Sequence, residues 1–109
     1  MNAEQLYEML KKSQEPKGYF INPDKKMALE LIDGLLVNRE RYGYASCPCR
    51  LSSGNREGDQ DIICPCIYRE ADVREYGQCF CALYVSSDRE KAGKDIPVPE
   101  RRPPEKIHL

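Results

Sequence analysis

The chain has 109 residues, of which 40% are apolar, with no tryptophan and a formal net charge of −1 at pH 7. A chain of this length fits one small domain with a modest core, for which a bound metal centre is one expected source of stability. The near-neutral charge argues against bulk nucleic-acid binding. No apolar stretch approaches the roughly 20 residues that cross a bilayer.

Two helices are expected in the N-terminal half. Residues 3–13 place apolar side chains at helical spacing. The second helix has Asn22 as its expected N-cap and Pro23 as its first residue, and Gly43 follows its last turn. Inside this helix, Gly34 is expected to cost about 1 kcal/mol relative to alanine.

The C-terminal half is expected to contain loops and short helices. Residues 52–60 are polar and glycine-rich, which indicates a loop. Pro65 is expected to open a third helix that ends near Tyr76. The apolar run 82–85 fits either a helix or a strand, and a short helical turn is expected over 87–92.

These elements predict a mainly α protein in which residues 1–109 form a single small domain. An extended proline-rich tail is expected over about 96–109. The first five residues have neither the basic nor the apolar region of a secretory signal, so a cytoplasmic location is expected. In that compartment, clustered cysteines more often indicate a metal or redox site than a framework of structural disulfides.

Three Cys-x-Cys pairs carry the strongest chemical signal. They use all six cysteines of the chain and are Cys47-Pro48-Cys49, Cys64-Pro65-Cys66 and Cys79-Phe80-Cys81. Cysteines so close in sequence rarely bond to each other, so each pair is expected to face a metal or another pair. Four thiolates can hold one 4Fe-4S cluster. The two thiols left over can store two electrons as a dithiol/disulfide couple, although the spacing does not say which four would bind iron.

Other readings of the cysteines fit less well. Structural zinc sites usually have Cys-x2–4-Cys spacing, and the only histidine is His108. Three structural disulfides would suit a secreted mini-protein. The bacterial ferredoxin spacing is absent, which argues against an ordinary two-cluster electron carrier. A cluster-containing redox sensor or electron carrier without reductase activity stays open as the main alternative function.

The three motifs, in this order, resemble those of the catalytic subunit of the ferredoxin–thioredoxin reductase family. The resemblance covers about residues 20–104 and uses every cysteine. It implies short helices and loops wrapped around one 4Fe-4S cluster whose ligands are Cys47, Cys64, Cys66 and Cys79. It also implies a redox-active disulfide between Cys49 and Cys81.

The resemblance further implies an oxidoreductase that acts on disulfides. Single electrons would come from ferredoxin and pass to thioredoxin or a thioredoxin-like protein, with neither nucleic acid nor membrane involved. Members from oxygenic organisms pair with a small variable subunit, and the sequence leaves open whether this chain does so or acts alone. Cys49 would attack the target, while Cys81 would lie against the cluster. The neighbouring Arg50 is expected to favour the Cys49 thiolate. Arg50 and Arg69 also suit either a docking face for an acidic ferredoxin or ordinary solvated surface.

One position departs from the family pattern. Phe80 stands where plant and cyanobacterial members usually carry a histidine that is thought to assist proton transfer. The resemblance therefore leaves the proton donor open, and the candidate replacements are Tyr68, Tyr84 and Asp72.

Overall fold

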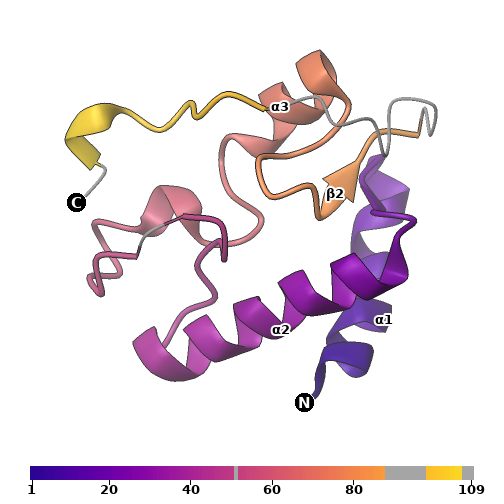
Figure 1. Ribbon diagram of the computed structural model, residues 1–109, viewed down its shortest axis with the longest axis horizontal. Coiled ribbons are helices and arrows are strands. Elements are labelled where there is room, and N and C mark those ends of the chain that lie inside the picture. The colour runs from indigo at the N-terminus through magenta and orange to yellow at the C-terminus, as the bar shows by residue number, and fades with distance from the viewer. Residues whose placement is uncertain (51, 88–97, 107–109) are drawn as a thin grey trace.

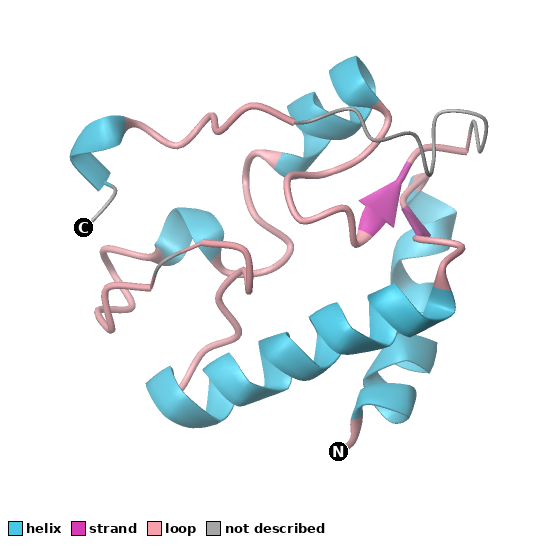
Figure 2. Ribbon diagram, in the orientation of Figure 1, coloured by secondary structure: helices cyan, strands magenta, loops and turns pink. Residues whose placement is uncertain are grey.

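Helices flank a layer of loops that carries the cysteines (Figure 1, Figure 2). A computed structural model describes residues 1–50, 52–87 and 98–106. The helices are α1 (Ala3–Gln14), α2 (Lys25–Tyr42) and α3 (Arg69–Tyr76), and short 3-10 turns occupy Glu15–Lys17, Gln60–Ile62 and Pro104–Lys106. The strands β1 (Phe20–Ile21) and β2 (Tyr84–Val85) pair antiparallel. The expected helices are therefore present, and a small sheet is added to them.

The first helix forms where its sequence predicts it. The side chain of Asn2 accepts a hydrogen bond from the backbone N–H of Gln5, and the Gln5 side chain accepts one from the N–H of Asn2. This reciprocal capping satisfies two amides that would otherwise lack partners. Leu6 and Leu10 then pack against the core beside α2. None of the helices in the described part of the chain is long and apolar enough to span a membrane.

The start of α2 differs from the prediction. Asp24, not Asn22, is the N-cap, and its side chain accepts a hydrogen bond from the N–H of Met27. Asn22 instead makes long-range contacts, because its side-chain amide donates to the carbonyl of Ala82 at 2.8 Å and its backbone N–H donates to the carbonyl of Leu83 at 2.8 Å. A residue suited to capping is thus used to join β1 to the segment that follows the last cysteine pair.

A close approach to the first cysteine pair explains the glycine inside α2. A Cβ atom placed on Gly34 would lie 2.9 Å from the Cβ of Pro48. Real side chains do not tolerate such a distance, so the missing side chain lets the helix pack directly against the loop. Ile32 and Leu35, on either side of Gly34, are buried in the core.

The prediction that Pro65 opens the third helix is wrong. Pro65 lies in a bend, the next four residues form a turn in which the N–H of Arg69 bonds to the carbonyl of Cys66, and α3 begins only at Arg69. The helix ends at Gly77, whose φ of +80° suits glycine. The apolar run 82–85 forms strand β2 at its end, while residues 88–92 of the expected helical turn lie outside the described residues.

The segment 98–106 is held by three consecutive charged residues. Glu100 pairs with Arg50, and Arg101 pairs with Asp72 and Glu75. Arg102 is buried, with its Nε 2.9 Å from Asp61 Oδ2. These contacts attach the end of the described chain to the first cysteine loop, to α3 and to the polar loop.

Candidate metal and thiol site

Three of the four-residue turns in the loop layer begin at a cysteine. Their backbone hydrogen bonds run from Arg50 to Cys47 at 3.2 Å, from Arg69 to Cys66 at 3.2 Å and from Ala82 to Cys79 at 2.8 Å. In the first and last of these turns, the third residue is also a cysteine. Cys49 and Cys81 therefore occupy equivalent positions in two separate turns.

Backbone pairing brings the first two cysteine pairs together. The N–H of Cys47 donates to the carbonyl of Ile62 at 2.8 Å, and the N–H of Cys64 donates to the carbonyl of Ala45 at 2.9 Å. These two bonds form a short antiparallel bridge between the segments. Cys47 and Cys64 are consequently neighbours, although 17 positions of sequence separate them.

The third pair is held by the strand that follows it. The N–H of Cys79 bonds to the carbonyl of Tyr84 at 2.9 Å, and the N–H of Tyr84 points at the sulfur of Cys79 at 3.3 Å. Ala82, at the bend between them, has a φ of +64°, which is unusual for a residue with a Cβ. The side chain of Asn22 donates to the carbonyl of Ala82, so a contact from the residue that follows β1 supports this strained turn.

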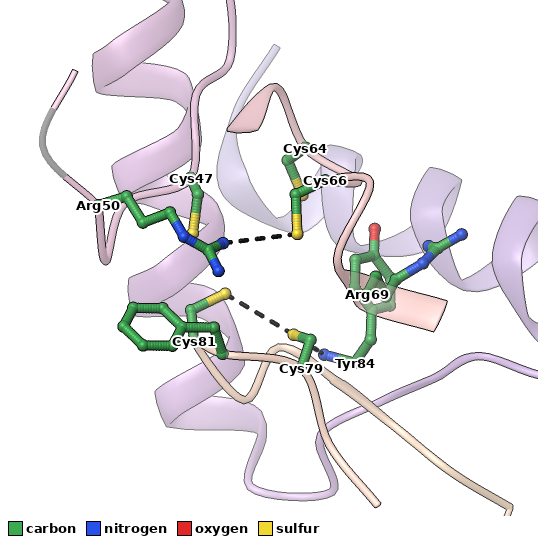
Figure 3. A pocket seen from close by; sticks show the side chains of 9 residues that line it. Cys47, Arg50, Cys64, Cys66, Arg69, Cys79, Cys81 and Tyr84 are labelled. Carbon is green, nitrogen blue, oxygen red and sulfur yellow. Dashed lines mark hydrogen bonds between the residues drawn. The ribbon is translucent and has the colours of Figure 1, made fainter. Parts of the chain in front are cut away.

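Five of the six sulfurs surround one space, here called the sulfur-lined hollow (Figure 3). Its lining consists of Cys47, Cys64, Cys66, Cys79 and Cys81, with Arg50, Arg69, Phe80 and Tyr84. The hollow encloses about 260 Å³ that no atom occupies, including the part open to solvent. Cys49 is not part of the lining and is exposed, whereas Cys81 is buried.

Hydrogen bonds between sulfurs link the first and third pairs. All six cysteines are free thiols. The pKa of Cys47 falls to about 3, first because the thiol of Cys49 donates to it and then because Cys81 does. The pKa of Cys49 rises to about 11, mainly because its proton is held by the Cys47 sulfur. Cys81 donates to Cys49 as well, and its own pKa is raised by these donated bonds and by burial.

The remaining three thiols differ in their surroundings. The thiol of Cys81 lies 3.8 Å from the sulfur of Cys79, and that hydrogen bond is the main reason why the pKa of Cys79 is lowered. Burial raises the pKa of Cys64 and of Cys66. At Cys66 the positive charge of Arg50 acts in the opposite direction and offsets part of the rise. Thiolate character is therefore favoured at the first cysteine of the first and third pairs.

Two arginines line the hollow without forming a surface patch. The side chain of Arg50 is only 2% exposed, and its Nη1 lies 3.5 Å from the sulfur of Cys66. Arg69 donates to the side chain of Gln14 at 2.7 Å and stacks against aromatic rings. The expectation that Arg50 helps to dock a partner is wrong, because the residue is buried. The expectation that it favours the Cys49 thiolate is also wrong, because its guanidinium points at Cys66 and the pKa of Cys49 is raised.

The three candidate proton donors lie in different places. The hydroxyl of Tyr68 already donates to Asp61 at 2.7 Å, and Asp72 accepts a hydrogen bond from Arg101 at 2.5 Å without lining the hollow. Tyr84 does line it, and its buried hydroxyl has no hydrogen-bond partner within the described residues. Of these three, Tyr84 alone contacts the space shared by the cysteines.

The donor set of the sulfur-lined hollow suits a group of several metal atoms, because it consists of thiols from three separate loops. Iron–sulfur clusters are held by thiolates placed around a multi-atom core. A ring of sulfurs from three loops, with backbone and guanidinium N–H groups directed at two of them, has the chemistry of such a site.

Comparison with known proteins agrees with this chemistry. The family model described as "Ferredoxin thioredoxin reductase catalytic beta chain" matches residues 1–102. The chain belongs to this family. The family membership implied by the three cysteine motifs is thereby confirmed.

Curated relatives of the family share about a third of their aligned residues with the chain. The chloroplastic ferredoxin-thioredoxin reductase catalytic chain of Arabidopsis thaliana is 30% identical over 99 residues, covering 85% of this chain and 65% of that protein. A chloroplastic catalytic chain of Spinacia oleracea is 34% identical over 74 residues, covering 66% and 49%. The Synechocystis catalytic chain is 31% identical over 84 residues, covering 73% and 67%. The matched region thus spans between about half and two thirds of these relatives.

Proposed function

We propose that this protein is a disulfide reductase that takes electrons from ferredoxin and reduces thioredoxin or a thioredoxin-like protein. The relatives' names contain both partners. The observation that carries the proposal is the unequal exposure of two thiols that occupy equivalent positions in two turns. Cys49 is accessible to a partner, whereas Cys81 is buried in the lining of the sulfur-lined hollow.

The proposed cofactor is one 4Fe-4S cluster. Its proposed ligands are Cys47, Cys64, Cys66 and Cys79, which all line the hollow. When bound, the cluster would supply electrons one at a time to the neighbouring disulfide. The N–H of Tyr84, directed at the sulfur of Cys79, would stabilise the thiolate form of that ligand.

The exchange itself is proposed to use the other two cysteines. The Cys49 thiol first loses its proton to solvent, and the resulting thiolate attacks one sulfur of the target disulfide, which breaks the S–S bond and releases the second sulfur as a thiolate. The Cys81 thiolate then attacks the Sγ of Cys49 in the mixed disulfide. The target leaves as a dithiol after protonation of its two sulfurs, and a Cys49–Cys81 disulfide remains. Two electrons and two protons return this disulfide to the starting dithiol.

The surroundings of the two thiols support this division of work. An exposed sulfur can reach a protein partner, while a buried neighbour that already hydrogen-bonds to it needs little movement to attack it. The proposed compartment is the cytoplasm, whose reducing conditions keep free thiols reduced. A small variable subunit, implied by the family resemblance for members from oxygenic organisms, is proposed as a further partner.

Serine substitutions of the two thiols test the proposal. In protein prepared without air, Cys49→Ser should abolish thioredoxin reduction while iron, acid-labile sulfide and visible absorption persist. Cys81→Ser should instead accumulate the mixed disulfide, because the resolving thiol is missing. Mass spectrometry should locate that crosslink at Cys49.

The outcomes separate the proposal from its main alternative. If Cys49→Ser reduces thioredoxin at the parent rate, the attacking thiol is misassigned. If the parent protein binds iron and sulfide but transfers no electrons from ferredoxin to a disulfide, a redox sensor or electron carrier replaces the reductase. If the parent protein binds no iron, the cluster proposal is wrong.

A further inference from the structure

The guanidinium of Arg50 is the only charged group in the described residues that has a hydrogen bond to a cysteine sulfur. We propose that Arg50 raises the reduction potential of the metal centre by placing an N–H donor and a positive charge against the sulfur of Cys66. This inference rests on the proposed function, because it requires Cys66 to be a cluster ligand. It assigns a tuning role to a residue that takes no part in the thiol exchange.

Three hydrogen bonds to Glu100 fix the direction of the guanidinium. Its Nε lies 3.1 and 3.0 Å from the two carboxylate oxygens of Glu100, and its Nη2 lies 2.9 Å from one of them. A planar guanidinium held along one edge by a carboxylate presents its remaining donors in a fixed direction. That direction leads to Cys66, whose sulfur lies 3.5 Å from Nη1 (Figure 3).

Aromatic rings shield the same group from water. The centre of the Phe80 ring lies 4.4 Å from the guanidinium carbon, and the centre of the Tyr68 ring lies 5.2 Å from it. With only 2% of the Arg50 side chain exposed, its charge is weakly screened by solvent and salt. Glu100 is 28% exposed and compensates that charge from the side away from the sulfur. Phe80, the residue inside the last cysteine motif, thereby gains a role as a support for the cation.

Elementary electrostatics gives the sign of the effect. Reduction adds one negative charge to a centre that already carries four thiolates, and a nearby cation stabilises the more negative state. Potentials of iron–sulfur centres depend on net charge, on hydrogen bonds to sulfur and on exposure. Arg50 supplies a hydrogen bond and a charge inside a buried site, so its removal should make the centre harder to reduce.

The test compares three variants of the anaerobically prepared holoprotein. Arg50→Gln should lower the midpoint potential, with about a tenfold fall in the ratio of reduced to oxidised centre at a fixed ambient potential. For a one-electron couple this corresponds to about 59 mV. Arg50→Lys, which keeps the charge but loses the planar fork, should give a smaller fall. Glu100→Gln keeps the cation but removes the carboxylate that compensates its charge, so the melting temperature should fall while the potential should not fall.

Redox titration followed by absorbance and electron paramagnetic resonance gives the potential, and iron analysis gives the loading. Equal potentials in the parent, Arg50→Gln and Arg50→Lys proteins at equal iron content would overturn the inference and leave the proposed function intact. Equal shifts in Arg50→Gln and Glu100→Gln would also overturn it, because anchoring of residue 100 would then explain both. If Arg50→Gln fails to retain iron, the potential of Arg50→Lys decides the matter. A parent protein without iron would overturn the inference together with the proposed cofactor.

Discussion

Helix α2 packs so closely against the first cysteine turn that replacing Gly34 by alanine should destabilise the protein, although alanine favours a helix more than glycine does. Gly34→Ala would by itself favour the helix by about 1 kcal/mol. The new Cβ would lie 2.9 Å from the Cβ of Pro48, a ring atom next to the backbone that cannot swing aside. Overpacking of this kind costs about 1–3 kcal/mol. The net expectation is a loss of about 1 kcal/mol, which would lower the melting temperature by about 4–8 °C.

A matched control separates the two effects. Asp33 is exposed in the same helix, so Asp33→Ala should gain the helical preference without an overlap and should stabilise the protein by up to about 0.7 kcal/mol. Thermal unfolding of the parent and both variants, followed by circular dichroism, gives the comparison. In a double-mutant cycle, Pro48→Gly removes the contacted Cβ and should make Gly34→Ala less harmful.

The two substitutions are expected to change the melting temperature in opposite directions. If Gly34→Ala raised the melting temperature as much as Asp33→Ala does, α2 could not lie as close to Pro48 as described. If the double-mutant cycle showed no coupling between positions 34 and 48, the destabilisation would have to come from another source. Either result would remove the explanation offered for the glycine.

Two further predictions concern contacts that hold the site's surroundings. Burial alone would raise the pKa of Asp61 and Asp59, but the bond from Arg102 lowers that of Asp61 and hydroxyl donors lower that of Asp59. Their stabilisation is therefore present above about pH 4 and is lost as pH falls through the lower folded-state pKa. Asp61→Asn should cost about 1–3 kcal/mol at pH 7 and progressively less as pH falls below about 4 in urea unfolding, and a pH-independent cost would contradict this origin. Asn22→Ala, which loses the 2.8 Å bond to the Ala82 carbonyl, should destabilise the protein by about 1–2 kcal/mol, and an unchanged melting temperature would show that this bond does not support the turn.

The hydroxyl donors to Asp59 show why that carboxylate tolerates its buried position. It accepts hydrogen bonds from Tyr44 at 2.5 Å, from Ser52 at 2.6 Å and from the Ser53 hydroxyl at 2.8 Å. A buried carboxylate is costly unless its lone pairs are used in this way. Protonation of Asp59 would weaken several of these hydrogen bonds at once, and each bond would account for part of the lost stability.

Local signals predicted the elements better than their boundaries. Gly43 and Gly77 both end helices, as a glycine after the last helical turn commonly does. The beginnings were harder, because Asn22 and Pro65 are suited to helix starts but serve other purposes. Asn22 joins distant segments, and Pro65 lies in a bend just before the turn that precedes α3. Rules based on neighbouring residues could not show that contacts with distant segments would decide the structure at these two positions.

The cysteine motifs identified the family, but they did not predict the surroundings of the sulfurs. The exposure of Cys49 and the burial of Cys81 are properties of the folded loops. The burial of Arg50 depends on Glu100, which follows it by 50 positions and lies in a different segment. An arginine next to a cysteine looks solvent-exposed in sequence until its distant carboxylate partner is known.

The three anchors at residues 100–102 also bear on the order in which the protein can be completed during synthesis. Arg50 has its carboxylate partner at residue 100, and the counter-charges of Asp59, Asp61 and Asp72 lie at residues 101 and 102. A ribosome makes these four groups well before it makes residues 100–102. The growing polypeptide must therefore keep them hydrated until residues 100–102 have been made, and only then can they enter the dry interior as ion pairs.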